Sequence, residues 1–78
     1  MGMLTAELDV LDGVEVARIR IASGLTQREL AGMVRMSVSG INKIEQNKRR
    51  NSDIATVAAL ARALAVPIEE LLKRSSPE

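Results

Sequence analysis

The sequence contains no cysteine, histidine, phenylalanine, tryptophan or tyrosine among its 78 residues. Without thiolate or imidazole side chains, the chain has no metal site of the zinc-binding type and no Cys-His or Ser-His-Asp catalytic group. Without aromatic rings it has no platform on which the bases of a single strand could stack. We therefore expect neither an enzyme nor a bound metal or cofactor, and this length allows one small domain.

Long apolar runs and a basic N-terminus are also absent. No apolar run reaches the roughly 18 residues of a membrane span, and Glu7, Asp9 and Asp12 occupy the region where a secretion signal would carry bases. Hydrophobic residues make up 46% of the chain and charged residues 27%, which is ordinary for a folded soluble domain. We expect a cytoplasmic protein with no membrane partner.

The net charge of +1 hides an uneven distribution. Residues 1–15 contain four acids and no base, whereas residues 16–52 contain eight bases and two acids, a net charge of +6. The remainder of the chain carries a net charge of −1. The middle block is therefore a candidate anion-facing surface within a nearly neutral protein.

Local signals favour helices throughout. Ala, Leu, Arg and Glu are plentiful, and Thr26 with Glu29 has the spacing of a capping box at the start of a helix. Asp12 with Glu15 has the same spacing. Further starts are marked by Ser37, Ser52 and Pro67.

Helix ends are marked by Gly24 and Asn47, residues that tolerate the left-handed backbone conformation. Starts and ends together predict an all-α domain with one core. The five expected helices cover residues 13–23, 27–34, 38–46, 53–64 and 67–73.

The ends of the chain lack clear caps. We expect an N-terminal extension over residues 1–11, a domain over 12–74 and a C-terminal tail over 75–78. Within the extension, Leu4, Leu8 and Leu11 recur at spacings typical of an apolar helical stripe, which would pack on the core or on a partner.

A helix-turn-helix is predicted at about residues 26–46, because only Arg35, Met36 and Ser37 separate the second and third helices. The stretch TQRELA from Thr26, then Met36-Ser37, then INKIEQNK from Ile41 resembles the DNA-binding domain of the phage Cro and lambdoid-repressor family, also called the XRE family. The resemblance runs from about Val16 to Leu72. It implies a five-helix, lambda-repressor-like fold.

Two positions depart from the family pattern, which has glycine at both. Asn47 is a mild change because asparagine tolerates positive φ. Arg35 is a harder one, since a long side chain with positive φ costs about 1 kcal/mol that the turn must absorb or avoid. Arg35 also adds a cation near the DNA.

In this motif the helix after the turn enters the major groove with its N-terminal part first. Asn42 is suited to bidentate pairing with adenine, and Lys43 to guanine O6 and N7. Ser39 is suited to either base type, and Val38 to a thymine methyl group. These four are the candidate base-contacting residues, although each could also be an ordinary exposed helix residue.

Phosphate contacts are expected from helix starts and from the basic loop, and these contacts fix register without reading sequence. Gln27 is equally suited to supporting the cap of its own helix. The family pattern further implies a partly buried, structural ion pair between Arg20 and Glu45. The candidate phosphate-contacting residues are Gln27, Ser37, Lys48, Arg49, Arg50 and Ser52.

A homodimer is expected, because one small module buries only about 600–1,000 Å² on DNA. Two-fold symmetry would set two recognition helices roughly 34 Å apart on a pseudopalindrome. Alternatively, the residues expected at the interface only close the monomer core. They are Val66, Ile68, Leu71 and Leu72, with Leu4, Leu8 and Leu11 as additions.

These features favour a sequence-specific, homodimeric transcriptional regulator of double-stranded DNA, a repressor or a controller, that needs no cofactor. One alternative is an antitoxin that masks a toxin and represses its own operon. Another is the controller protein of a restriction-modification system. A toxin or RNA polymerase would be the protein partner.

Overall fold

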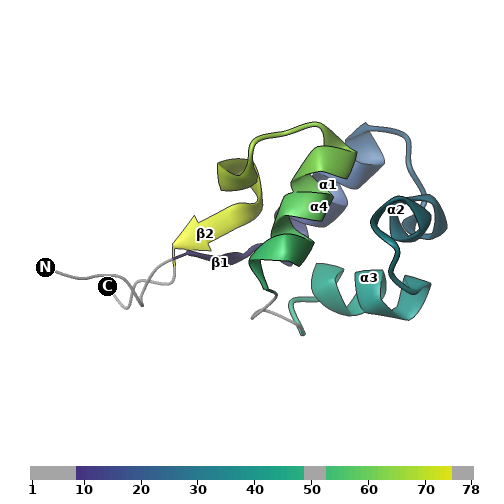
Figure 1. Cartoon of the computed structure of the whole chain (residues 1–78), viewed down its shortest axis with the longest axis horizontal. Helices are drawn as coiled ribbons and strands as arrows, with labels where there is room; N and C mark the ends of the chain where they lie inside the picture. The colour runs from purple at the N-terminus through teal and green to yellow at the C-terminus, as the bar shows by residue number, and fades with distance from the viewer. Residues whose placement is uncertain (1–8, 49–52, 75–78) are drawn as a thin grey trace, which may run out of the picture.

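The computed structural model describes residues 9–48 and 53–74, which form four α-helices, one 3-10 helix and two short strands (Figure 1). The four helices confirm the all-α class, and their bounds agree closely with the first four predicted helices. The helices are α1 (Gly13–Ala22), α2 (Gln27–Val34), α3 (Val38–Glu45) and α4 (Ile54–Leu64). The remaining elements are β1 (Asp9–Leu11), the 3-10 helix η1 (Ile68–Leu71) and β2 (Leu72–Arg74).

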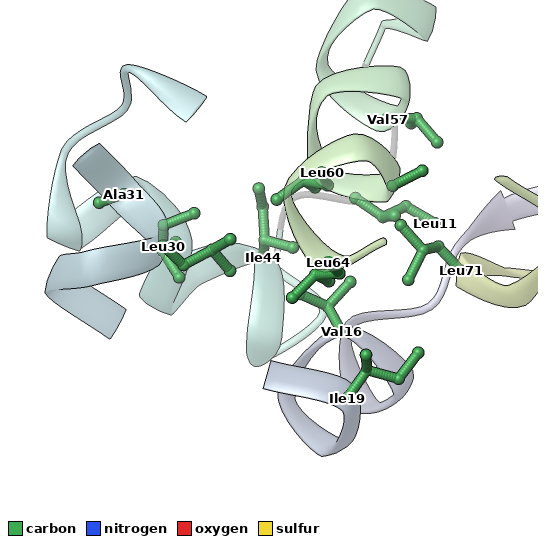
Figure 2. Packing of buried hydrophobic residues seen from close by; sticks show 12 residues of the cluster. Leu11, Val16, Ile19, Leu30, Ala31, Ile44, Val57, Leu60, Leu64 and Leu71 are labelled. Carbon is green, nitrogen blue, oxygen red and sulfur yellow. The ribbon is translucent and has the colours of Figure 1, made fainter. Parts of the chain in front are cut away.

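One core joins the four helices and both ends of the domain. In Figure 1, α1 and α4 occupy the middle of the molecule, α2 and α3 lie at one end, and the strands lie at the other. Side chains from every helix converge between them (Figure 2). The buried residues are Leu11, Val16, Ile19, Leu30, Ala31, Ile41, Ile44, Val57, Leu60, Ala61, Leu64 and Leu71.

All four helices end in the same way, with one residue in the left-handed conformation. The next residue then donates its N–H to the carbonyl five positions back, which satisfies an otherwise unpaired helix carbonyl. The predicted ends at Gly24 and Asn47 are confirmed. The left-handed residues are Gly24, Arg35, Asn47 and Ala65, and the bonds are Leu25 to Arg20, Met36 to Ala31, Lys48 to Lys43 and Val66 to Ala61.

The predicted capping box at the start of α2 is confirmed. Glu29 N donates to Thr26 Oγ1 at 3.0 Å, and Thr26 N donates to Glu29 Oε1 at 2.8 Å. At α4 the cap is Asp53, whose carboxylate accepts from Thr56 N at 2.9 Å. The predicted start at Ser52 lies outside the described residues.

The capping box predicted between Asp12 and Glu15 is wrong. Asp12 caps α1 by accepting from Val14 N at 3.1 Å. Its own N–H donates to Leu71 O at 2.7 Å, so none is left for the Glu15 carboxylate. Glu15 instead pairs with Arg18. The cap is therefore completed by a distant segment of the chain and not by a neighbour.

The fifth predicted helix, at 67–73, is wrong in its type and length, because only a 3-10 helix over Ile68–Leu71 is present. The chain makes one 3-10 turn, in which Glu70 N donates to Pro67 O at 3.0 Å, and then extends into β2. There Leu72 is paired with Leu11 of β1 in an antiparallel ribbon, which satisfies backbone groups that a helix would have paired internally.

This ribbon corrects two further expectations. Leu11 lies in a strand and is buried in the core, so it does not continue a helical stripe, and Leu4 and Leu8 lie outside the described residues. Leu71 is fully buried within the monomer, so its assignment to a dimer interface is wrong. Val66, Ile68 and Leu72 are half-buried.

Candidate nucleic-acid interface

The turn between α2 and α3 is held at both of its ends. Arg35 adopts the left-handed conformation, with φ 59° and ψ 43°, and Met36 N donates to Ala31 O at 2.9 Å. Met36 packs against the core. At the other end, Ser37 Oγ accepts from Gly40 N at 3.0 Å and so caps α3. The turn thus fixes α3 relative to α2 even though arginine stands where glycine is expected.

The strain at Arg35 gives a first testable prediction. Arg35 and Ala65 have the same φ of 59° and ψ of 43°. We expect Arg35→Gly and Ala65→Gly each to raise the free energy of unfolding by about 0.5–1 kcal/mol, because relief of left-handed strain exceeds the added entropy of the unfolded chain. Urea unfolding measures both. A loss of stability in Arg35→Gly alone would show that the arginine side chain itself supports the fold.

A largely buried ion pair joins α1 to α3, although both residues keep some exposure. Arg20 Nε donates to Glu45 Oε2 at 2.6 Å, and Arg20 Nη2 donates to Glu45 Oε1 at 3.0 Å. The side chains are 13% and 7% exposed, respectively. The bond to Glu45 raises the pKa of the Arg20 guanidinium above its ordinary high value, so Arg20 stays charged at neutral pH. This is the pair that the family resemblance implies.

The same carboxylate also holds the start of α2. Gln27 Nε2 donates to Glu45 Oε1 at 3.0 Å, and Arg20 Nη1 donates to Leu25 O just before α2. Glu45 therefore clamps three helices together. Gln27 serves the fold through this bond, and its contact with a phosphate stays a prediction.

A second contact fixes the end of α3 against the start of α1. Asn47 has φ 60°, and its Oδ1 accepts from Gly13 N at 2.9 Å. Gly13 is buried against the carbonyl of Ile44, and a Cβ at this position would overlap that oxygen. Asparagine at 47 thus both adopts the left-handed conformation and bonds to α1, whereas glycine could only do the former.

The outer face of α3 is polar and open to solvent. Ile41 and Ile44 are fully buried on the inner face. On the other side, Ser39, Lys43 and Gln46 are exposed and Asn42 is half-buried, while Val38 is 39% exposed near the helix start. Positions 39, 42, 43 and 46 follow the i, i+3, i+4, i+7 spacing of one helical stripe. The structure therefore brings the four predicted base-contacting residues to the accessible part of α3.

Gln46 was not among the residues selected from the sequence. It is the cap residue of α3, and its Nε2 donates to Asn42 Oδ1 at 2.7 Å. The signal that could have found it is the helical spacing, which continues one turn beyond Asn42 and Lys43.

The charge of this region is set by exposed bases. The two acids of the middle block are both engaged internally, Glu29 in the α2 cap and Glu45 in the buried ion pair. The predicted contacts at Arg49, Arg50 and Ser52 lie outside the described residues. The exposed bases on α2, on the turn, on α3 and just beyond its end are Arg28, Arg35, Lys43 and Lys48.

Within residues 9–48 and 53–74, no helix has the length and apolar character to cross a membrane. The same part of the chain brings together no group of three or more acidic, His or Cys residues that could hold a metal ion.

Comparison with known proteins places this arrangement among helix-turn-helix domains. Residues 16–71 match the family model described as helix-turn-helix. The restriction-modification controller protein C.AhdI from Aeromonas hydrophila is 30% identical, with a TM-score of 0.70 over 76% of this chain and 88% of that one. A search of curated proteins gives no match.

Two regulators show similar structures. SinR, the master regulator of biofilm formation from Bacillus subtilis, solved in complex with DNA, is 25% identical, with a TM-score of 0.72 over 76% of this chain and 94% of that one. The hypothetical transcription factor NHTF from Neisseria is 26% identical, with a TM-score of 0.71 over 92% of this chain and 88% of that one.

Proposed function

The chain belongs to the XRE family of helix-turn-helix, DNA-binding transcription regulators, and we propose that it acts as a homodimer that reads a pseudopalindromic operator. The observation that carries this proposal is the accessible polar stripe of α3, held in place by the buried Arg20–Glu45 pair. A rigid, solvent-facing helix of this kind is what direct reading of the major groove requires.

In the proposed complex α3 enters the major groove with its N-terminus first. Val38 and Ser39 meet the first bases, and Asn42 and Lys43 the following ones. Ser37 and Lys48 lie at the two ends of α3, where their groups would contact phosphates on either side of the groove. The exposed bases supply the attraction to the DNA backbone that does not depend on sequence.

The dimer would use the surface beyond α4. Val66, Ile68 and Leu72 are half-buried there. The strand β2, which begins at Leu72, lies at the end of the molecule away from α2 and α3 (Figure 1). Joining two copies at this end keeps both α3 helices free, as a two-fold site with half-sites roughly 34 Å apart demands. Leu71 takes no part because it lies within the monomer core.

A matched pair of lysines tests the assigned roles. Lys43→Ala and Lys48→Ala each remove one exposed charge, so both are expected to weaken binding to all DNA and to lower the salt slope by about one. Only Lys43→Ala is expected to relax the preference at one base position, at a cost of about 1–3 kcal/mol on the specific site. Fluorescence anisotropy with specific and scrambled duplexes measures both effects. Equal losses on both duplexes for Lys43→Ala would contradict base contact.

The likeness to C.AhdI favours a more specific role, that of a restriction-modification controller protein. Under this hypothesis the protein binds DNA in the same way, and its operator lies beside genes for an endonuclease and a methyltransferase. Mapping of the bound sites in the source genome tests this directly. Sites confined to unrelated genes would exclude the controller role and leave the general regulator.

A protein partner is the other open part of the proposal. SinR was also solved in complex with the SinI protein, so a protein that contains a similar domain has a protein partner as well as DNA. A toxin or RNA polymerase as the partner of this chain, and with it the antitoxin role, is tested by co-purification from the source cells.

A further inference from the structure

We propose that Gln46 is a positioning residue that decides which base edges Asn42 reads, an inference that rests on the proposed function. The two side chains lie one helical turn apart, and Gln46 Nε2 donates to Asn42 Oδ1 at 2.7 Å. Gln46 is exposed and Asn42 half-buried on the outer face of α3. The bond therefore lies within the surface that faces DNA.

The direction of this hydrogen bond determines which end of the Asn42 amide faces the groove. One end of the amide is an acceptor oxygen and the other an NH2 group with two donors. Because Oδ1 of Asn42 is turned toward Gln46, Nδ2 is the end left to meet the groove. An unheld asparagine turns about its last torsion angle and presents either end. With Gln46 as the donor, Asn42 presents a hydrogen-bond donor to the groove.

This orientation predicts a preference among bases. In the major groove guanine presents the acceptors N7 and O6, adenine presents N7, and thymine presents O4. Cytosine presents only the N4 donor. A donor at Asn42 therefore discriminates against cytosine. The bidentate pairing with adenine expected from the sequence would use both ends of the amide, so Oδ1 would accept from adenine N6 as well as from Gln46, which its two lone pairs allow.

Two variants of Gln46 separate this role from a general one. Gln46→Ala removes the bond and frees the Asn42 amide to rotate. The differences in affinity among the four bases at the position that Asn42 reads should therefore become smaller. Gln46→Glu replaces the donor with an acceptor, so Asn42 turns its NH2 group inward and presents Oδ1 to the groove. Cytosine should then become a favoured base. Neither variant touches the core, and thermal unfolding checks that each remains folded.

The experiment selects duplexes from a random pool with the wild type and with Asn42→Ala, which identifies the base position that Asn42 reads. Affinities for all four bases at that position are then measured for the wild type, both Gln46 variants and the Asn42→Ala/Gln46→Ala double variant. We expect the wild type to disfavour cytosine by roughly two- to tenfold, the range of one hydrogen bond. Gln46→Ala should abolish this difference, and Gln46→Glu should reverse it. The double variant should have the same affinities as Asn42→Ala alone.

Three results would overturn the inference while leaving the proposed function intact. Gln46→Ala could weaken all sequences alike, which would make Gln46 a phosphate contact. It could alter a different base position, or its effect could add to that of Asn42→Ala, and either would make it an independent reader. If the wild type selects no consensus at all, the proposed function itself fails.

Discussion

Replacing Gly13 with alanine is expected to lower the free energy of unfolding by about 3 kcal/mol, the upper range for overpacking a rigid contact. The added Cβ would overlap the Ile44 carbonyl oxygen and lie 3.0 Å from Asn47 Oδ1. The overlapped atom is backbone and cannot rotate aside. Helix α1 would have to move away from α3, breaking the bond from Gly13 N to Asn47 Oδ1.

Such a loss is a large part of the roughly 4–12 kcal/mol expected for a domain of this length. Urea unfolding followed by circular dichroism measures it. The matched control is Gly32→Ala, because Gly32 lies within α2 and a Cβ there would meet nothing within 4 Å. The free energy of unfolding of this control should rise by about 1 kcal/mol, because alanine has a higher helix propensity than glycine. Similar stability of the two variants would contradict the close packing of α1 on α3.

Replacing Glu45 with alanine is expected to lower the free energy of unfolding by about 3 kcal/mol, the low end for removing one partner of a buried ion pair. The Arg20 guanidinium, 13% exposed, would keep its charge without its main acceptor, and Gln27 would lose its bond as well. Glu45→Gln keeps the size of the side chain and one acceptor oxygen, so it should lower the free energy of unfolding less than Glu45→Ala does. Because α3 would no longer be clamped, affinity for DNA of any sequence should fall too.

The comparison that isolates burial is Glu15→Ala. Glu15 and Arg18 form an ion pair at 2.6 Å, as short as the buried one, but Arg18 is 61% exposed. Solvent screens an exposed pair, so its removal should change stability little. Chemical denaturation of both alanine variants gives the difference. If Glu45→Ala proves no more harmful than Glu15→Ala, the clamp on three helices is not a source of stability.

The sequence predicted the elements that depend on neighbouring residues. The capping box of Thr26 and Glu29 and the helix ends at Gly24 and Asn47 are local signals, and the structure contains all of them. For Arg35 the sequence left two outcomes open, and the structure shows that the turn absorbs the strain, with Arg35 at φ 59°.

The errors share one cause, which is contact between the two ends of the chain. Leu11 and Leu72 pair across the ribbon, and the N–H of Asp12 donates to Leu71 O. With these bonds Leu11 lies in a strand, and the predicted fifth helix is one 3-10 turn followed by a strand. Helical periodicity in a short window says nothing of such distant pairing. Gln46 was missed because it falls at the predicted end of the helix, where its bond to Asn42 depends on the geometry of the cap.

The central claim, that α3 reads a two-fold operator, is tested most directly by selecting duplexes from a random pool with the purified chain and measuring binding of the winners across a salt series. We expect a symmetric consensus with half-sites about one helical turn apart, 10–10.5 base pairs, and an affinity that falls steeply with salt. The claim would be contradicted if the selected duplexes were bound no more tightly than scrambled duplexes of the same length.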